Sequence, residues 1–128
     1  MAIRIVRLGT VRHRSEGLRI GTVRRPPRGV AKSQYAKQNW FDVWFPALAP
    51  SARIVKLAQT ARTDRQWAVF VRRYRAEMAT PDKSRLLKLL AAMSKETNFS
   101  VGCYCADEAR CHRSVLRGLL KDHGALLA

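Results

Sequence analysis

Acidic residues, cysteines and long apolar runs are all scarce in this sequence. Nine Asp and Glu stand against 25 Lys and Arg among 128 residues, which gives a formal net charge of +16 at pH 7. No stretch approaches the roughly 18 apolar residues that a membrane-spanning helix needs. The sequence also has no internal repeat, no glycine-rich nucleotide loop and no low-complexity tail. These absences argue against a helical membrane protein and a repeat protein.

The cysteines are too few and too closely spaced for a disulfide framework. Cys103, Cys105 and Cys111 lie within nine positions, and their number is odd. Such cysteines suit a reducing compartment. The first residues carry arginines among too few apolar side chains for a signal peptide. We therefore expect a cytoplasmic protein that has no contact with a membrane.

The excess of positive charge predicts an anionic partner. A domain this basic attracts nucleic acid through counterion release, or steers a small phosphorylated ligand over a long range. A solvated basic surface without a specific partner is the third alternative. Apolar residues make up 47% of the chain, so we expect residues 1–128 to form one domain with its own core, without a cofactor.

The hydrophobic pattern predicts a mixed α/β fold. Period-two alternation indicates strands over residues 2–8, 18–23 and 99–105, and helical spacing indicates helices over 51–61, 63–78 and 81–95 and from Ser114 onward. The long helical connection between the second and third strands favours parallel pairing. We expect a small, mainly parallel sheet flanked by helices, in a three-layer, Rossmann-like arrangement.

Two further segments are each rich in one type of side chain, aromatic in residues 40–45 and arginine in residues 24–29. Trp40, Phe41, Trp44 and Phe45 form an aromatic stripe, which is more often core than a base-stacking platform. Residues 24–29 read Arg-Arg-Pro-Pro-Arg-Gly and follow the second predicted strand. The two prolines stiffen this loop, and its arginines can grip an oxyanion bidentately. The loop is either an anion clamp or a basic connector.

The segment from Cys103 to Arg113 joins the last predicted strand to the last helix. Cys103-x-Cys105-x5-Cys111-His112 offers zinc ligands without the usual zinc spacing, so we assign no metal. A thiolate is stabilised at a helix N-terminus, so Cys111 or Cys105 can be a nucleophile. The phosphatase spacing of cysteine, five residues and arginine is not met, and the loop can also bind an anion without reacting. Cys103 reads best as a buried small hydrophobe.

Three stretches together resemble the DUF488 family of small bacterial proteins. They are residues 24–29 before Val30, Leu48-Ala-Pro-Ser51 with Phe70-Val-Arg-Arg-Tyr-Arg-Ala-Glu77, and Cys105-Ala-Asp-Glu before Cys111-His-Arg113. The resemblance implies a cytosolic, single-domain α/β protein with a site at its Cys-His-Arg loop. The family name denotes an unknown function, so no reaction is implied. Many members have Asp-Arg-Leu-Trp-Pro-Arg-Gly where this chain has residues 23–29, so an acid and a tryptophan are missing here.

We expect the two loops to converge at the carboxyl edge of the sheet, because both follow predicted strands. The leading hypothesis is an enzyme-like pocket for a phosphorylated, nucleotide-type ligand, and the alternative is a non-catalytic nucleic-acid-binding module that uses the basic surface. The candidate catalytic residues are Cys111 or Cys105 as nucleophile, His112 as base or orienter, and Glu108, which fixes His112 or an arginine. The candidate anion-binding residues are Arg24, Arg28, Arg113 and, more weakly, His13.

Overall fold

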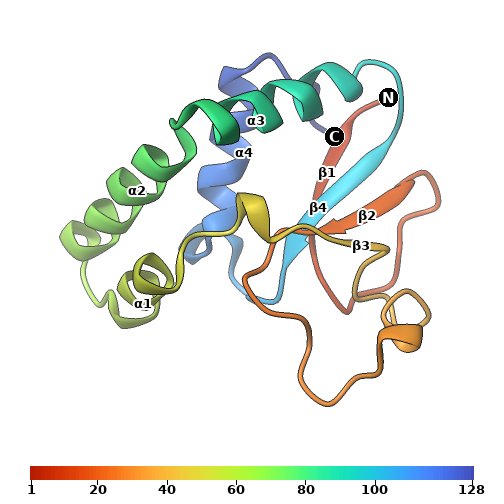
Figure 1. Ribbon diagram of the computed structural model, residues 1–128, viewed down its shortest axis with the longest axis horizontal. Helices are drawn as coiled ribbons and strands as arrows, with labels where there is room; N and C mark the ends of the chain where they lie inside the picture. Colours follow the sequence, from red (N-terminus) through yellow and green to blue (C-terminus); the bar gives the residue numbers. More distant parts are fainter.

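The computed structural model describes residues 1–128 as a parallel sheet with four α-helices (Figure 1). The strands are β1 (Ile3–Arg7), β2 (Leu18–Gly21), β3 (Val43–Trp44) and β4 (Phe99–Cys103), in the order β1-β4-β2-β3. The helices are α1 (Ala52–Thr60), α2 (Asp64–Met78), α3 (Pro81–Met93) and α4 (His112–Asp122). All strand pairs are parallel, so the prediction of an α/β fold is confirmed.

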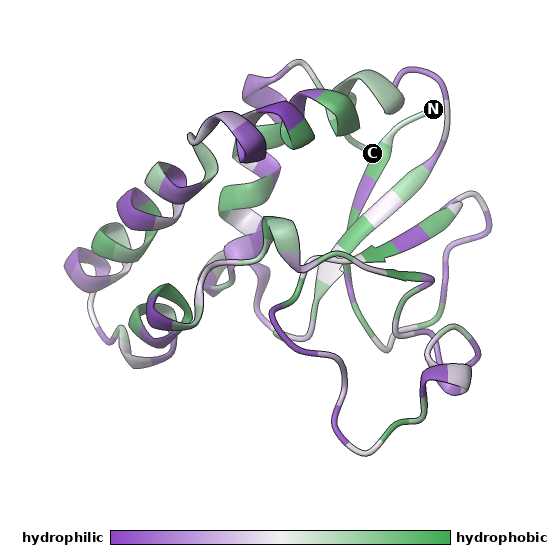
Figure 2. Cartoon of the chain, in the orientation of Figure 1, coloured by the Kyte–Doolittle hydropathy of each residue, from purple (hydrophilic) through white to green (hydrophobic).

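The helices begin where local chemistry favours a start. Thr63 and Gln66 form a reciprocal capping box at the start of α2, which satisfies backbone N–H groups that have no partner within the helix. Pro81 occupies the first turn of α3, where a backbone N–H would have no partner within the helix, so the N–H that proline lacks costs no hydrogen bond. Hydrophobic and hydrophilic positions recur along α1, α2 and α3 in Figure 2. Each of these helices therefore has one face that can be buried.

The main core lies between one face of the sheet and the helices. Phe99 and Val101 of β4 belong to the same buried cluster as Leu116 and Leu120 of α4. The opposite face of the sheet is covered by loops: the ring of Phe41 lies so close to Gly21 that an added Cβ would be 2.4 Å from it. The third layer that we expected is thus made of loop instead of helix.

The strand order explains how the two candidate loops meet. β4 pairs with β2, with Ile20 opposite Val101 and Gly21 opposite Gly102. Parallel neighbours end at the same edge of a sheet. The segments that follow Gly21 and Cys103 therefore leave the sheet side by side, as the sequence predicted.

Two local differences separate the structure from the prediction. The aromatic segment contributes the short edge strand β3, and Trp44 within it is 43% exposed, so only part of the aromatic stripe is core. Helix α4 begins at His112 instead of Ser114, and Cys111 is its N-cap.

None of the helices combines the length and the apolar character that are needed to cross a membrane.

A buried ion pair stabilises the loop face of the sheet. Arg19 Nε and Nη2 donate to the two carboxylate oxygens of Glu16 at 2.6 and 2.9 Å, and Ser100 Oγ donates to Glu16 Oε2 at 2.7 Å. Arg19 Nη1 donates to the backbone oxygens of Thr10 and Asn39. The exposed fractions of Arg19 and Glu16 are 0% and 2%. This pair joins β2 and β4 to the loops that cover them.

Candidate functional site

A broad groove of about 1570 Å³ opens at the carboxyl edge of the sheet. Its walls come from the end of β1, the Arg24–Arg28 segment, the start of α1, the end of β4 and His112. Four arginines line it and no aspartate or glutamate does: Arg7, Arg24, Arg25 and Arg28. A concave wall with charge of one sign concentrates anions. All the charged side chains that line the groove are therefore positive, apart from the titratable cysteines, tyrosine and histidine.

The arginine loop is held in place from both sides of the groove. Arg24 donates from Nε to the Pro50 oxygen at 3.1 Å and from Nη2 to the Ala49 oxygen at 3.0 Å. The hydroxyl of Tyr104, which follows β4, donates to the backbone oxygen of Arg25 at 2.9 Å. These bonds hold the loop at Arg24 and Arg25, ahead of Arg28.

Arg25 and Arg28 have guanidinium groups without a protein partner. Both side chains are exposed on the groove, and neither makes an ion pair or a hydrogen bond with another residue. Arg7, by contrast, donates from Nε to the backbone oxygen of Tyr104 at 3.3 Å. A guanidinium that is not paired within the protein keeps its fork of donors for an external oxyanion.

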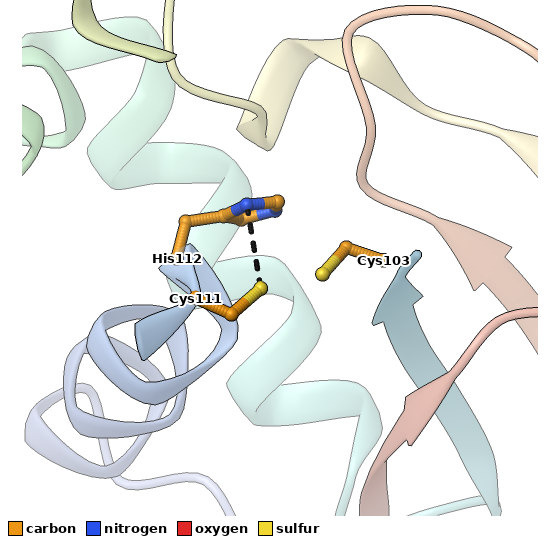
Figure 3. A group of neighbouring side chains, drawn as sticks. All are labelled: Cys103, Cys111 and His112. Carbon is orange, nitrogen blue, oxygen red and sulfur yellow. Dashed lines mark hydrogen bonds between the residues drawn. The ribbon is translucent and has the colours of Figure 1, made fainter. Parts of the chain in front are cut away.

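Three thiols and one imidazole gather at the floor of the groove. Cys103 is the last residue of β4, and Cys111 and His112 open α4; Figure 3 shows their side chains pointing toward one another. The sulfur atoms of Cys103 and Cys111 and a ring nitrogen of His112 all lie within 4.8 Å of one another. Cys103 and Cys111 are each 1% exposed, while Cys105 is exposed and lines the groove. Cys105 is therefore the thiol that a ligand in the groove can reach.

Hydrogen bonds among the thiols separate their pKa values. Bonding to the thiols of Cys105 and Cys111, together with burial, raises the pKa of Cys103. The pKa of Cys105 is lowered by the hydrogen bond from Cys103 and by the positive charge of Arg113. The pKa of Cys111 is lowered chiefly by Cys103, with a contribution from His112. Of the three thiols, Cys103 thus loses its proton least readily.

His112 is fixed by the backbone of the neighbouring loop. Its Nε2 lies 2.7 Å from the backbone oxygen of Thr22, and its Nδ1 lies 3.9 Å from Cys111 Sγ. A carbonyl oxygen can only accept, so Nε2 carries the proton and Nδ1 of the neutral ring has a free lone pair. This lone pair faces the cysteine thiol.

Arg113 lies beneath the groove instead of on its wall. It is 4% exposed, and its Nη2 donates to the Cys105 oxygen at 2.5 Å. Burial by itself lowers the pKa of Arg113, but the hydrogen bond with Cys111 and the negative charges of Cys103, Cys111 and Glu108 together outweigh burial and raise it. Arg113 is thus placed to hold the Cys105 backbone and to stabilise thiolates, not to contact a ligand in the groove.

Glu108 and His13 do not line the groove and contact other residues of the protein. Glu108 accepts from Arg117 Nε and Nη2 at 2.9 and 2.8 Å, which ties the Cys105–Cys111 loop to α4. His13 is exposed, lies outside the groove and contacts Arg4 and Ser15.

The groove combines predicted and unpredicted residues. Of the predicted site residues, the structure places Arg24, Arg28, Cys105 and His112 on the groove and Cys111 directly behind it. Arg7 and Tyr104 were missed as site residues, and Trp40 was interpreted as part of an aromatic stripe that is more often core. Arg7 could have been found, because it ends the first strand, beside the loop after β4.

Fold and site together define a basic α/β domain with an arginine-lined groove over a cysteine–histidine cluster. The chain belongs to the DUF488 family, since the family model DUF488-N3a, described as the active DUF488-N3 subclade, matches residues 3–124. This match confirms the resemblance seen in the sequence. Neither the curated proteins nor the solved structures include a match to this chain.

Proposed function

We propose that the groove binds a phosphorylated, nucleotide-type ligand and that Cys105 is the nucleophile toward it. One observation carries the proposal: the only exposed thiol lies in a groove that four arginines and no carboxylate line. The description of the family's subclade as active agrees with an enzyme.

Phosphate is the ligand group that the arginines fit best. A guanidinium presents parallel N–H donors that match two oxygens of one phosphate. Arg25 and Arg28 are free of protein partners and stand on a loop that Arg24 and Tyr104 already hold. Such preorganisation lowers the entropy lost on binding.

An aromatic pair supplies the second part of a nucleotide site. Trp40 and Tyr104 both line the groove, and their rings form an edge-to-face pair with centroids 5.9 Å apart. A nucleobase stacks on such rings with about 1–3 kcal/mol per base. Arginines for the phosphate and rings for the base thus lie in one groove.

The chemistry of the proposal is phosphoryl transfer to sulfur. The Cys105 thiolate forms an S–P bond as the P–O bond to the leaving group breaks, and the leaving oxygen takes the bonding electrons and a proton from solvent. Water then cleaves the S–P bond, which releases phosphate and regenerates the thiolate. Arg113, whose guanidinium lies beneath the loop and holds the Cys105 oxygen, fixes the backbone that carries the nucleophile.

The basic face of α2 favours a second candidate, a nucleic-acid-binding module. Arg65, Arg72 and Arg73 are exposed there and have no ion-pair or hydrogen-bond partner. Binding of this kind rests on phosphate neutralisation, so its affinity falls steeply with salt. It needs neither the groove nor the cysteines.

Isothermal titration with adenosine monophosphate tests the proposal. We expect the monophosphate to bind more tightly than adenosine, and Arg28→Ala to weaken its binding by about tenfold or more, because a charged hydrogen bond contributes about 1.5–3 kcal/mol. Arg85→Ala is the matched control, since Arg85 is an exposed arginine of α3 that does not line the groove.

Two results would contradict the groove as the binding site. One is equal affinity for adenosine and its monophosphate. The other is equal weakening by Arg28→Ala and Arg85→Ala. If a single-stranded RNA oligonucleotide binds with a steep dependence on salt, and Arg72→Ala weakens it while Arg28→Ala does not, the second candidate is supported instead.

A further inference from the structure

We infer that Cys103, Cys111 and His112 form a binding site for a thiophilic divalent metal ion, with Zn²⁺ as the expected occupant. The three ligand atoms lie within 4.8 Å of one another and come from the end of β4 and the start of α4. Two thiolates and one imidazole are a ligand set of zinc sites that keep a fourth position open. This inference goes beyond the proposed function, because it concerns the buried cysteines and not Cys105.

The orientation of His112 is that of a metal ligand. Metal-bound histidines almost always donate their other ring N–H to a carboxylate, a backbone carbonyl or water. His112 Nε2 donates to the Thr22 oxygen at 2.7 Å, and Nδ1 is turned toward Cys111 Sγ. The ring therefore needs no change of tautomer or direction to bind an ion between the sulfur atoms.

The surroundings of Cys111 suit a bound thiolate. Cys111 caps the N-terminus of the 11-residue helix α4, and its Sγ accepts the backbone N–H of Arg113 at 3.5 Å. The helix dipole and this N–H both stabilise negative charge on sulfur. Two thiolates neutralise a divalent ion, so the occupied site carries no net charge beside the buried guanidinium of Arg113. Cys103, whose pKa is raised in the free protein, releases its proton to solvent when the ion binds.

The groove gives a metal ion access to the cluster, and the types of ligand determine which ions the cluster binds. Cys103 and His112 both line the groove, which gives an ion a path from solvent. Sulfur and imidazole ligands without a carboxylate disfavour Mg²⁺ and Ca²⁺, which prefer oxygen. The site thus selects zinc-like ions by ligand type.

The sequence offered these zinc ligands, but we assigned no metal there because the ligands are not spaced as in common zinc motifs. Cys103 and Cys111 are separated by seven residues, whereas structural sites usually pair cysteines two to four residues apart. The strand-to-helix connection brings them together in space instead.

Titration of the reduced, chelator-treated protein with Co²⁺ tests the inference, since Co²⁺ reports thiolate ligation and tetrahedral geometry by its absorption. We expect one equivalent to bind with sulfur-to-cobalt charge-transfer bands and tetrahedral ligand-field bands, and Zn²⁺ to displace it. Cys111→Ser and His112→Ala should weaken binding by more than the roughly 10–100-fold that follows loss of an outer-shell partner. His13→Ala is the control, because His13 is exposed and outside the cluster.

X-ray absorption at the zinc edge of the wild-type protein keeps the inference testable if the variants do not fold. Sulfur and nitrogen together in the first coordination shell support the site. A shell of nitrogen and oxygen alone overturns it, as does Co²⁺ binding that lacks charge-transfer bands or that His13→Ala weakens as much as His112→Ala.

Discussion

Replacement of Glu16 by glutamine is expected to lower the free energy of unfolding by about 3–5 kcal/mol, as measured by urea denaturation. The change removes the negative partner of Arg19, whose side chain is 0% exposed. A buried charge without its partner is strongly destabilising, because the interior cannot solvate it. The same change weakens the bond from Ser100 on β4.

An exposed ion pair provides the control for this result. Arg75 and Asp122 are 44% and 63% exposed, so Asp122→Asn should change stability by less than about 1 kcal/mol. Equal losses in the two variants would contradict a special role for the buried pair.

The pH dependence of the Glu16→Gln effect gives a second readout. Burial by itself raises the pKa of Glu16, but the hydrogen bonds from Arg19 and Ser100 outweigh it and lower the pKa from 4.5 to about 2. A lowered pKa stabilises the folded state above pH 4.5, and this contribution is lost as the pH falls toward 2. The stability difference between the wild type and Glu16→Gln should therefore shrink across this range. A difference that stays constant would show that the carboxylate charge is not the cause.

Alkylation of the native, metal-free protein by iodoacetamide should be confined almost entirely to Cys105. The reagent must contact sulfur, and Cys103 and Cys111 are each 1% exposed, so their reaction requires local opening. We expect both to react at least about 100-fold more slowly than Cys105, as followed by mass spectrometry of peptides. Adenosine monophosphate in the groove should slow the reaction of Cys105.

The unfolded chain is the control for this experiment. In concentrated urea the three cysteines should react at similar rates, because the differences come from the fold and not from the neighbouring sequence. Native Cys111 reacting as fast as Cys105 would contradict the placement of Cys105 as the accessible nucleophile.

The fold could be predicted from the sequence where elements carry a regular pattern. The alternation of Phe99, Val101 and Cys103 and the capping box at Thr63 both correspond to observed elements. The strand β3 could not be predicted, because two residues are too few for a period and both Val43 and Trp44 are more than 40% exposed. The layer of loops on the second face likewise has no periodic signal.

The convergence of the two loops could be predicted from the sequence, but the placement of individual side chains could not. The sequence placed both loops at one sheet edge because each follows a strand, which is a property of parallel topology. It could not show that Arg113 turns inward while Arg7 faces the groove, since both are arginines beside a strand or helix end. The buried pair of Glu16 and Arg19 was also missed, because charged residues in a loop and a strand usually remain in solvent.

The most direct test of the central claim is to map adenosine monophosphate binding by backbone amide chemical shifts of the labelled protein. The account predicts that the largest changes occur at Arg24–Gly29, Tyr104, Cys105 and His112, which line or adjoin the groove, with little change in α3. Changes centred on the arginines of α2, with the groove unaffected, would contradict the account and indicate binding by the basic surface.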